Sequence, residues 1–215
     1  MKSYVITIMD NEKSVRAAER CISTAKRNAN IDVQIFKAIT PKNDPQKRFK
    51  DLGLTAKNFD EKYSKSQNAM AAFLSHYTLW TMAVEDNEDY IIFEHDAVID
   101  SKIPTIGYSG AITFSQPSYG KYNTPMFIGV GPLTQKNYFG GAHGYIVTPK
   151  GAKMIVEAAK KYAAPTDVYL NMNLFPWLQE SYPWSCRADD TFSTIQRENG
   201  CLAKHNYKDG YEYLK

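Results

Sequence analysis

Short apolar runs and a segment of helical apolar spacing follow one another along the first forty residues. The run SYVITIM (3–9) is short and β-branched and ends at polar residues, which predicts a buried strand. Residues 13–27 repeat apolar side chains every three or four positions and predict a helix, and residues 31–39 alternate as a second strand. A strand, a helix and a strand in this order predict the start of a parallel sheet with a right-handed crossover.

A polar excursion and then a strongly apolar helix occupy the middle of the chain. Residues 40–66 are polar, lysine-rich and contain two prolines, so we expect a long loop with a short helical turn or two. An apolar stripe over residues 68–87 predicts a helix with Asn68 as its N-cap. The run DYIIFEHDAVI (89–99) then predicts a central strand.

The second half of the chain continues the alternation of strands and helices. We expect strands near 110–115 and 126–130, a glycine-punctuated strand at 140–148, a helix at 149–162 with proline in its first turn, and a short helix within 165–174. With 215 residues the chain is long enough for one substantial core. The element order predicts an α/β fold with a mostly parallel sheet flanked by helices.

Composition and charge exclude several classes of protein without selecting one. The net charge of +3 is too weak to indicate a nucleic-acid binder by itself. The three cysteines are widely separated and lack CxxC spacing, which argues against a disulfide framework or a zinc site and favours a cytoplasmic setting. The first apolar run is too short for a signal peptide, and we expect no transmembrane segment.

The predicted central strand ends in three polar residues, Glu94, His95 and Asp96. Ligands of open α/β sheets bind at the carboxyl ends of strands. Because side chains alternate along a strand, we expect Glu94 and Asp96 to share one face and His95 to point away. Such a carboxylate pair suits Mg²⁺ or Mn²⁺ bridging a diphosphate, but a strand that simply becomes polar at solvent explains the same pattern.

Two histidines occur in less specific settings. His76 lies beside Phe73 and Trp80 on an apolar helix face, where a role in the core is the simpler explanation. The segment GGAHGYIVTPKGAK (140–153) places glycines around His143, which permits either close approach of a ligand to the backbone or a tight turn. No P-loop or dinucleotide-binding glycine motif is present in the sequence.

Several segments, taken in order, resemble glycosyltransferase family 25, which includes lipopolysaccharide β-galactosyltransferases and collagen galactosyltransferases. No single motif is specific, but their ordered recurrence over residues 3–195 is. The segments are YVITIMDNEKSVRAAE (4–19), FKAI (36–39), FLSHYTLW (73–80), EDNEDYIIFEHDAVI (85–99), GAHGYIVTPKGAKMIVEA (141–158) and PTDVYL (165–170).

The resemblance implies a GT-A fold, a nucleotide-sugar donor that is usually UDP-linked, a divalent cation and inversion at the anomeric carbon. Inversion means a single in-line displacement, in which a base deprotonates the acceptor hydroxyl and the diphosphate leaves an oxocarbenium-like sugar. The resemblance thus implies a hexosyl- or pentosyltransferase. In a single domain spanning 1–215, the donor would bind to residues about 1–100 and the acceptor to residues about 101–215.

Matched position by position, the resemblance makes Asp96 and Glu94 the metal-binding acids. His95 stands where the family has its first aspartate, which leaves open whether it contacts the donor or a metal. His205 is a further metal-ligand candidate because GT-A enzymes often use a late histidine, although a surface histidine in a tail is an equal alternative. The expected donor contacts are Arg16, Ala38, Ile39, Ser75, His76, Glu94 and His95.

The acceptor side is less determined. Asp167, in a Pro-x-Asp turn, is the first choice for acceptor binding or for the general base, with Asp189 and Asp190 as alternatives. A saccharide is the family's usual acceptor. Lysine-rich composition, also common in phage-encoded proteins, and the basic, aromatic segment KHNYKDGYEYLK (204–215) leave a hydroxymethylated DNA base as an alternative acceptor. His95 in place of an aspartate also leaves a non-catalytic binding module open.

Overall fold

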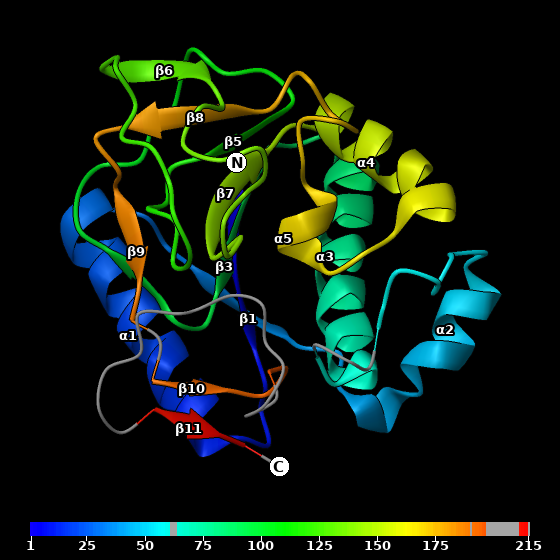
Figure 1. Cartoon of the computed structure of the whole chain (residues 1–215). Helices are drawn as coiled ribbons and strands as arrows, with labels where there is room; N and C mark the ends of the chain where they lie inside the picture. The colour runs from blue at the N-terminus through cyan, green and yellow to red at the C-terminus, as the bar shows by residue number, and fades with distance from the viewer. Residues whose placement is uncertain (61–63, 190, 197–210, 215) are drawn as a thin grey trace.

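A seven-stranded sheet forms the centre of the computed structural model, which describes residues 1–60, 64–189, 191–196 and 211–214 (Figure 1). Its strand order is β2-β1-β3-β7-β5-β8-β6. The strands are β1 (Lys2–Thr7), β2 (Gln34–Lys37), β3 (Tyr90–Glu94), β5 (Ala111–Thr113), β6 (Gly129–Pro132), β7 (Gly144–Val147) and β8 (Gln179–Tyr182).

The sheet is mixed, with five of its seven strands running in one direction. Strand β1 pairs in parallel with β2 and β3, and β5 pairs in parallel with β8. Strand β7 is antiparallel to both β3 and β5, and β6 is antiparallel to β8. The predicted α/β class is therefore confirmed, and the two reversed strands are what the sequence pattern did not reveal.

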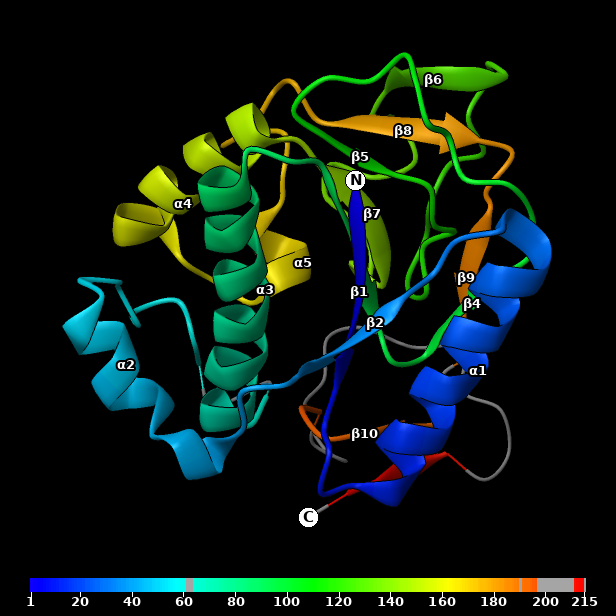
Figure 2. The same cartoon turned by 180° about the vertical axis from the view of Figure 1, so that it is seen from behind.

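Helices cover both faces of this sheet. Figures 1 and 2 show α1 (Glu12–Ala29) on one face and α3 (Ser66–Asp86) with α4 (Pro149–Tyr162) on the other. A hydrophobic core lies on each face of the sheet, and alternate residues of the central strands point into one core or the other. Ile91 and Phe93 pack with α1, whereas Tyr90 and Ile92 pack with α3 and α4. The loop after β2 holds the expected helical turns, η1 (Pro41–Asn43) and α2 (Pro45–Asp51), and α5 (Thr166–Tyr169) is short.

Local capping explains why some predicted helix bounds were accurate. Helix α4 begins at Pro149, and the Thr148 side chain accepts a hydrogen bond from the Gly151 amide at 3.1 Å. The prediction that Asn68 caps α3 was wrong. The helix starts two residues earlier, with Lys65 as N-cap, because the Lys65 amide donates to the Ile195 carbonyl at 2.8 Å.

The run predicted as one strand over 89–99 forms two. Strand β3 ends at Glu94, a turn follows, and β4 (Ala97–Ile99) leaves the main sheet to pair with β9 (Cys186–Ala188). The reason is burial, since Ala97 and Ile99 are fully buried in the core formed with α1. A second small pairing joins β10 (Phe192–Ser193) to β11 (Glu212–Tyr213).

Among the described helices, none combines the length and the apolar character required to cross a bilayer.

Candidate active site

The carboxyl ends of the parallel strands β1, β2 and β3 meet at one edge of the sheet. Register places Ile6 opposite Glu94 and Thr7 opposite Lys37. A cleft of about 960 Å³ opens beside the end of β3, and its walls come from segments that are far apart in the sequence. It is lined by Asn58, Asp60, Ser64, Ala69, Ala72, Glu94, His95, Asp96, Ser118, Tyr119, Gly120, Lys121, Tyr138, Gly141, Ala164, Pro165, Thr166, Asp167, Val168 and residues 192–196.

The described lining of this cleft is acidic. It contains the carboxylates of Asp60, Glu94, Asp96 and Asp167, and Lys121 is the only lysine or arginine among the described lining residues. The strand-end acids predicted from the sequence therefore share one cleft with Asp167, which lies more than seventy positions later. A diphosphate entering this cleft without a cation would meet like charge.

Asp96 has one carboxylate oxygen that the protein leaves unsatisfied. Its Oδ1 is buried and accepts no hydrogen bond from the described residues. Its backbone carbonyl accepts from the Asp189 amide at 2.9 Å, which ties the turn to the segment after β9. A buried carboxylate oxygen without a donor is costly, and a bound cation would supply the missing partner.

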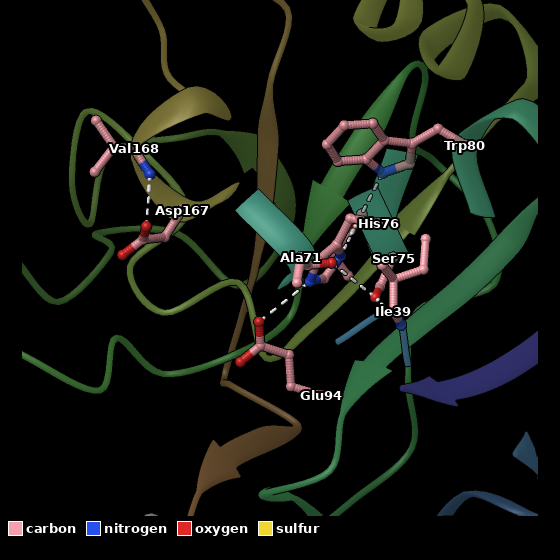
Figure 3. Close-up of polar contacts among 9 residues, drawn as sticks. Ile39, Ala71, Ser75, His76, Trp80, Glu94, Asp167 and Val168 are labelled. Carbon is pink, nitrogen blue, oxygen red and sulfur yellow. Dashed lines mark hydrogen bonds and ion pairs between the residues drawn. The ribbon is translucent and has the colours of Figure 1, made fainter. Parts of the chain in front are cut away.

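Glu94 is held from inside the protein by His76. The distance from His76 Nε2 to Glu94 Oε1 is 3.1 Å (Figure 3). His76 is 1% exposed, and burial lowers its pKa to about 3, so it is neutral near pH 7. The structure thus places His76 in the core, as its position on the apolar helix face predicted, and in contact with Glu94.

Alternation along a strand predicted that His95 points away from Glu94 and Asp96, and this prediction was wrong. The strand ends at Glu94, and all three residues line the cleft. The His95 ring stacks on Phe192 with 5.2 Å between ring centroids and an interplanar angle of 2°. Burial lowers the pKa of His95, so the ring is neutral at physiological pH and packs as an aromatic surface.

Asp167 projects from α5 into the same cleft. Its Oδ2 accepts a hydrogen bond from the Tyr119 hydroxyl. Its Oδ1 accepts from the Val168 amide at 2.9 Å (Figure 3). Burial raises the pKa of Asp167, whereas these hydrogen bonds act in the opposite direction. The residue is thus a carboxylate oriented by two donors beside the strand-end acids.

The other predicted donor contacts are not gathered with these acids. Ser75 is fully buried and acts as a brace, since its hydroxyl accepts from the Ile39 amide at 2.9 Å and donates to the Ala71 carbonyl at 3.0 Å (Figure 3). Ala38 lines a smaller hollow of about 240 Å³ between the loops after β1 and β2. Arg16 is exposed, pairs with Glu12 at 3.3 Å and lines neither hollow.

Of the three remaining candidates, one lies away from the cleft and two fall on residues that the structure does not describe. Asp189 forms an ion pair with Arg20 at 2.6 Å and does not line the cleft. Asp190 and His205 lie outside the described residues. Within the described residues, no group of three or more His, Cys, Asp or Glu side chains is placed to hold a metal ion by itself.

Sequence reasoning missed several partners of the site. Tyr119 and Phe192 have no motif around them that predicts a contact with Asp167 or His95. Tyr145 lies in the Gly-Tyr strand that was recognised, but its hydroxyl contact with His76 at 2.8 Å depends on how β7 packs against α3.

Comparison with known proteins gives three similarities. Residues 1–109 match the family described as "Glycosyltransferase family 25 (LPS biosynthesis protein)". A Haemophilus influenzae protein named "Putative glycosyltransferase" is 29% identical over 195 residues, covering 80% of this chain and 62% of that protein. The apo-form glycosyltransferase GlyE of Streptococcus pneumoniae is similar with a TM-score of 0.41 and 12% identity, covering 83% of this chain and 44% of that one.

The chain therefore spans less than two thirds of the length of the curated relative that it matches. The family match extends over 109 of the 215 residues and includes β1, α1, β2, α3 and the acidic end of β3. On this match, the chain belongs to glycosyltransferase family 25.

Proposed function

We propose that this chain is a metal-dependent, inverting glycosyltransferase that moves a sugar from a nucleotide sugar, in the simplest case a UDP-sugar, to a hydroxyl of a saccharide. One observation carries the proposal. A single cleft at the carboxyl end of β3 brings the acids Glu94 and Asp96 together with Asp167. This arrangement provides acids for the donor diphosphate and a separate carboxylate for the acceptor.

The side chains of the cleft fit Mg²⁺ or Mn²⁺. Both ions take oxygen ligands, and Mg²⁺ commonly binds through one or two carboxylates while substrate phosphates and water complete its shell. Asp96 would be the first ligand, because its buried Oδ1 has no donor among the described residues, and Glu94 the second. A cation there would neutralise charge on the diphosphate leaving group.

Asp167 is suited to remove the proton of the acceptor hydroxyl. A general base works best when its pKa is near the operating pH, and burial raises the pKa of Asp167 toward that range. The Tyr119 hydroxyl and the Val168 amide each donate to one of its oxygens and so orient the carboxylate. The smaller hollow at Ala38 would receive the nucleoside part of the donor.

A saccharide acceptor is favoured over duplex DNA by charge. The described lining of the cleft carries four carboxylates, at Asp60, Glu94, Asp96 and Asp167, which repel a phosphate backbone. In the lysine-rich loop after β2, Lys42 pairs with Asp10, and Lys47 pairs with Asp51 at 2.9 Å. Tight binding to duplex DNA that weakens steeply with salt would overturn the choice of a saccharide.

The test is metal-dependent turnover of a panel of nucleotide sugars. D96N should reduce both donor hydrolysis and transfer by more than about 100-fold, which exceeds the usual effect of residues that only orient a ligand. D32N, at an exposed acid paired with Lys26, is the matched control and should leave turnover unchanged. Full activity of D96N, or turnover that resists a chelator, contradicts the metal mechanism, and UDP binding without hydrolysis or transfer indicates a non-catalytic module.

A further inference from the structure

We propose that His76 is a positioning residue, held in a single tautomer by Trp80 and Tyr145, that fixes the orientation of the Glu94 carboxylate in the cleft. The inference rests on the proposed function only where it treats Glu94 as a donor-site acid. Its basis is the donor-to-acceptor direction of three successive hydrogen bonds. They join Trp80 on α3 to Tyr145 on β7, Tyr145 to His76 on α3, and His76 to Glu94 at the end of β3.

The direction of the first bond is fixed by the chemistry of tryptophan. An indole N–H can donate but cannot accept. Trp80 Nε1 lies 2.8 Å from the Tyr145 hydroxyl oxygen, which must therefore accept this bond. The same hydroxyl lies 2.8 Å from His76 Nδ1. Tyr145 is fully buried, and its one proton is satisfied by donation to His76 Nδ1.

The tautomer of His76 follows from this bond. A neutral imidazole has one ring nitrogen that accepts and one that donates. Because Nδ1 accepts from Tyr145, Nε2 carries the proton and donates to Glu94 Oε1 at 3.1 Å. The opposite tautomer would place the Nε2 lone pair against a carboxylate oxygen and would leave the Tyr145 proton without an acceptor.

Packing keeps this chain of hydrogen bonds rigid. Trp80 and Tyr145 are fully buried and His76 is 1% exposed, so none of these three side chains can turn toward solvent. The His76 ring stacks on Tyr145 with 5.8 Å between centroids and an interplanar angle of 23°. His76 and Trp80 are one helical turn apart on α3, which places both side chains over the same face of the sheet.

A neutral donor suits a site that must stay negative. An arginine or lysine at position 76 would orient Glu94 equally well, but it would cancel the charge that a divalent cation requires. Because Nδ1 must accept the Tyr145 proton, the His76 ring carries a single proton and is uncharged. His76 therefore restricts the carboxylate to one orientation without reducing its negative charge, as second-sphere partners of metal ligands commonly do.

Nitrogen-15 NMR of the histidine rings tests the tautomer in protein that is free of metal and nucleotide. Wild type should show His76 protonated at Nε2 and unprotonated at Nδ1. Y145F, which removes the donor to Nδ1 and keeps the ring, should shift the Nδ1 signal and lower the share of the Nε2-protonated form, which Glu94 alone still favours. Y169F removes another buried hydroxyl from the same core, against the Trp80 ring, and should leave the His76 signals unchanged. Wild-type His76 protonated at Nδ1 overturns the inference.

Manganese affinity, measured by calorimetry, tests the consequence for Glu94. Because the Gln amide can reach the position of Nε2 and donate, H76Q should bind Mn²⁺ within about three-fold of wild type. H76L should lose about ten-fold, the lower end of the effect of second-sphere partners. Equal affinities of folded H76L and H76Q would contradict the positioning role. If H76L does not fold, the Mn²⁺ affinity of H76Q and the tautomer of wild-type His76 test the role instead. A ten-fold loss of Mn²⁺ affinity in H76Q contradicts the positioning role, and retained affinity supports it.

These measurements separate the two proposals. A correct tautomer together with unchanged metal binding and turnover in D96N would contradict the proposed function and leave the fixed tautomer standing. A wrong tautomer in a metal-dependent transferase would contradict only the role of His76.

Discussion

Glu94 and Asp167 line the same cleft but are held by different parts of the fold. Glu94 ends a central strand and receives its hydrogen bond from His76, in a core shared by α3 and β7. Asp167 lies in the four-residue helix α5 and accepts from the adjacent Val168 amide and from half-buried Tyr119, which belongs to the connection between β5 and β6. Glu94, the proposed donor-side acid, is therefore supported by regular structure, and Asp167, the proposed acceptor-side acid, by loops.

In the proposed function, this difference separates the binding of the donor diphosphate from the recognition of the acceptor. Chemistry that needs precise geometry, such as holding a diphosphate, benefits from side chains fixed by a packed core. Recognition of varied acceptors benefits from loops on a rigid scaffold, because loops change without disturbing the core. Substitutions on the donor side should affect every reaction of the donor, whereas those on the acceptor side should affect transfer alone.

The largest expected effect that distinguishes the two sides comes from D167N. Loss of a general base should lower kcat for transfer by about 100- to 10,000-fold, while hydrolysis of the donor by water persists. Measuring both rates in one preparation provides the control, because D96N should lower both. A rise in the acceptor KM with an unchanged kcat would instead assign Asp167 to acceptor binding.

A smaller effect is expected from substitution of His95, whose ring stacks on Phe192 in the segment after β9. H95A removes the stack on Phe192, an interaction of about 1 kcal/mol, and should raise the donor KM about five-fold. H95F keeps an aromatic face without ring nitrogens and should stay within about two-fold of wild type. Equal losses in H95A and H95F would show that a ring nitrogen contacts the donor or the metal.

The Tyr119 hydroxyl should tune the pH dependence of transfer. Its hydrogen bond stabilises the charged form of Asp167 and lowers a pKa that burial has raised. Y119F removes the donor, so the pKa of Asp167 rises further and the base is protonated at a higher pH. The acid limb of the kcat/KM profile should therefore move to higher pH. Y162F, at an exposed tyrosine that does not line the cleft, should leave that limb in place.

The smallest effect is expected from R16A. Sequence matching placed Arg16 near the diphosphate, but its side chain is exposed and pairs with Glu12 on the same helix. Because Arg16 lines neither the cleft nor the smaller hollow, its loss should change the donor KM less than two-fold. A rise of ten-fold or more would restore Arg16 to the donor site.

Local interactions explain which predictions of structure succeeded. Helix α4 matched its predicted bounds of 149–162 because Thr148 and Pro149 define its start through neighbouring atoms. The start of α3 and the break after Glu94 were missed because each depends on a distant segment: Ile195 binds the Lys65 amide, and β9 pairs with β4. Apolar periodicity records how a segment is buried but not which segment covers it.

The sequence by itself determined the α/β order of elements, the acidic end of β3 and the family resemblance over residues 3–195. Each is encoded in short windows, where periodicity, capping and motif spacing act between neighbours in the chain. Only the tertiary structure decided that Asp167 shares a cleft with Glu94, that His95 stacks on Phe192, and that His76 donates to Glu94. Such contacts join residues across the whole chain, and they arise because packing both faces of one sheet brings those segments to the same edge.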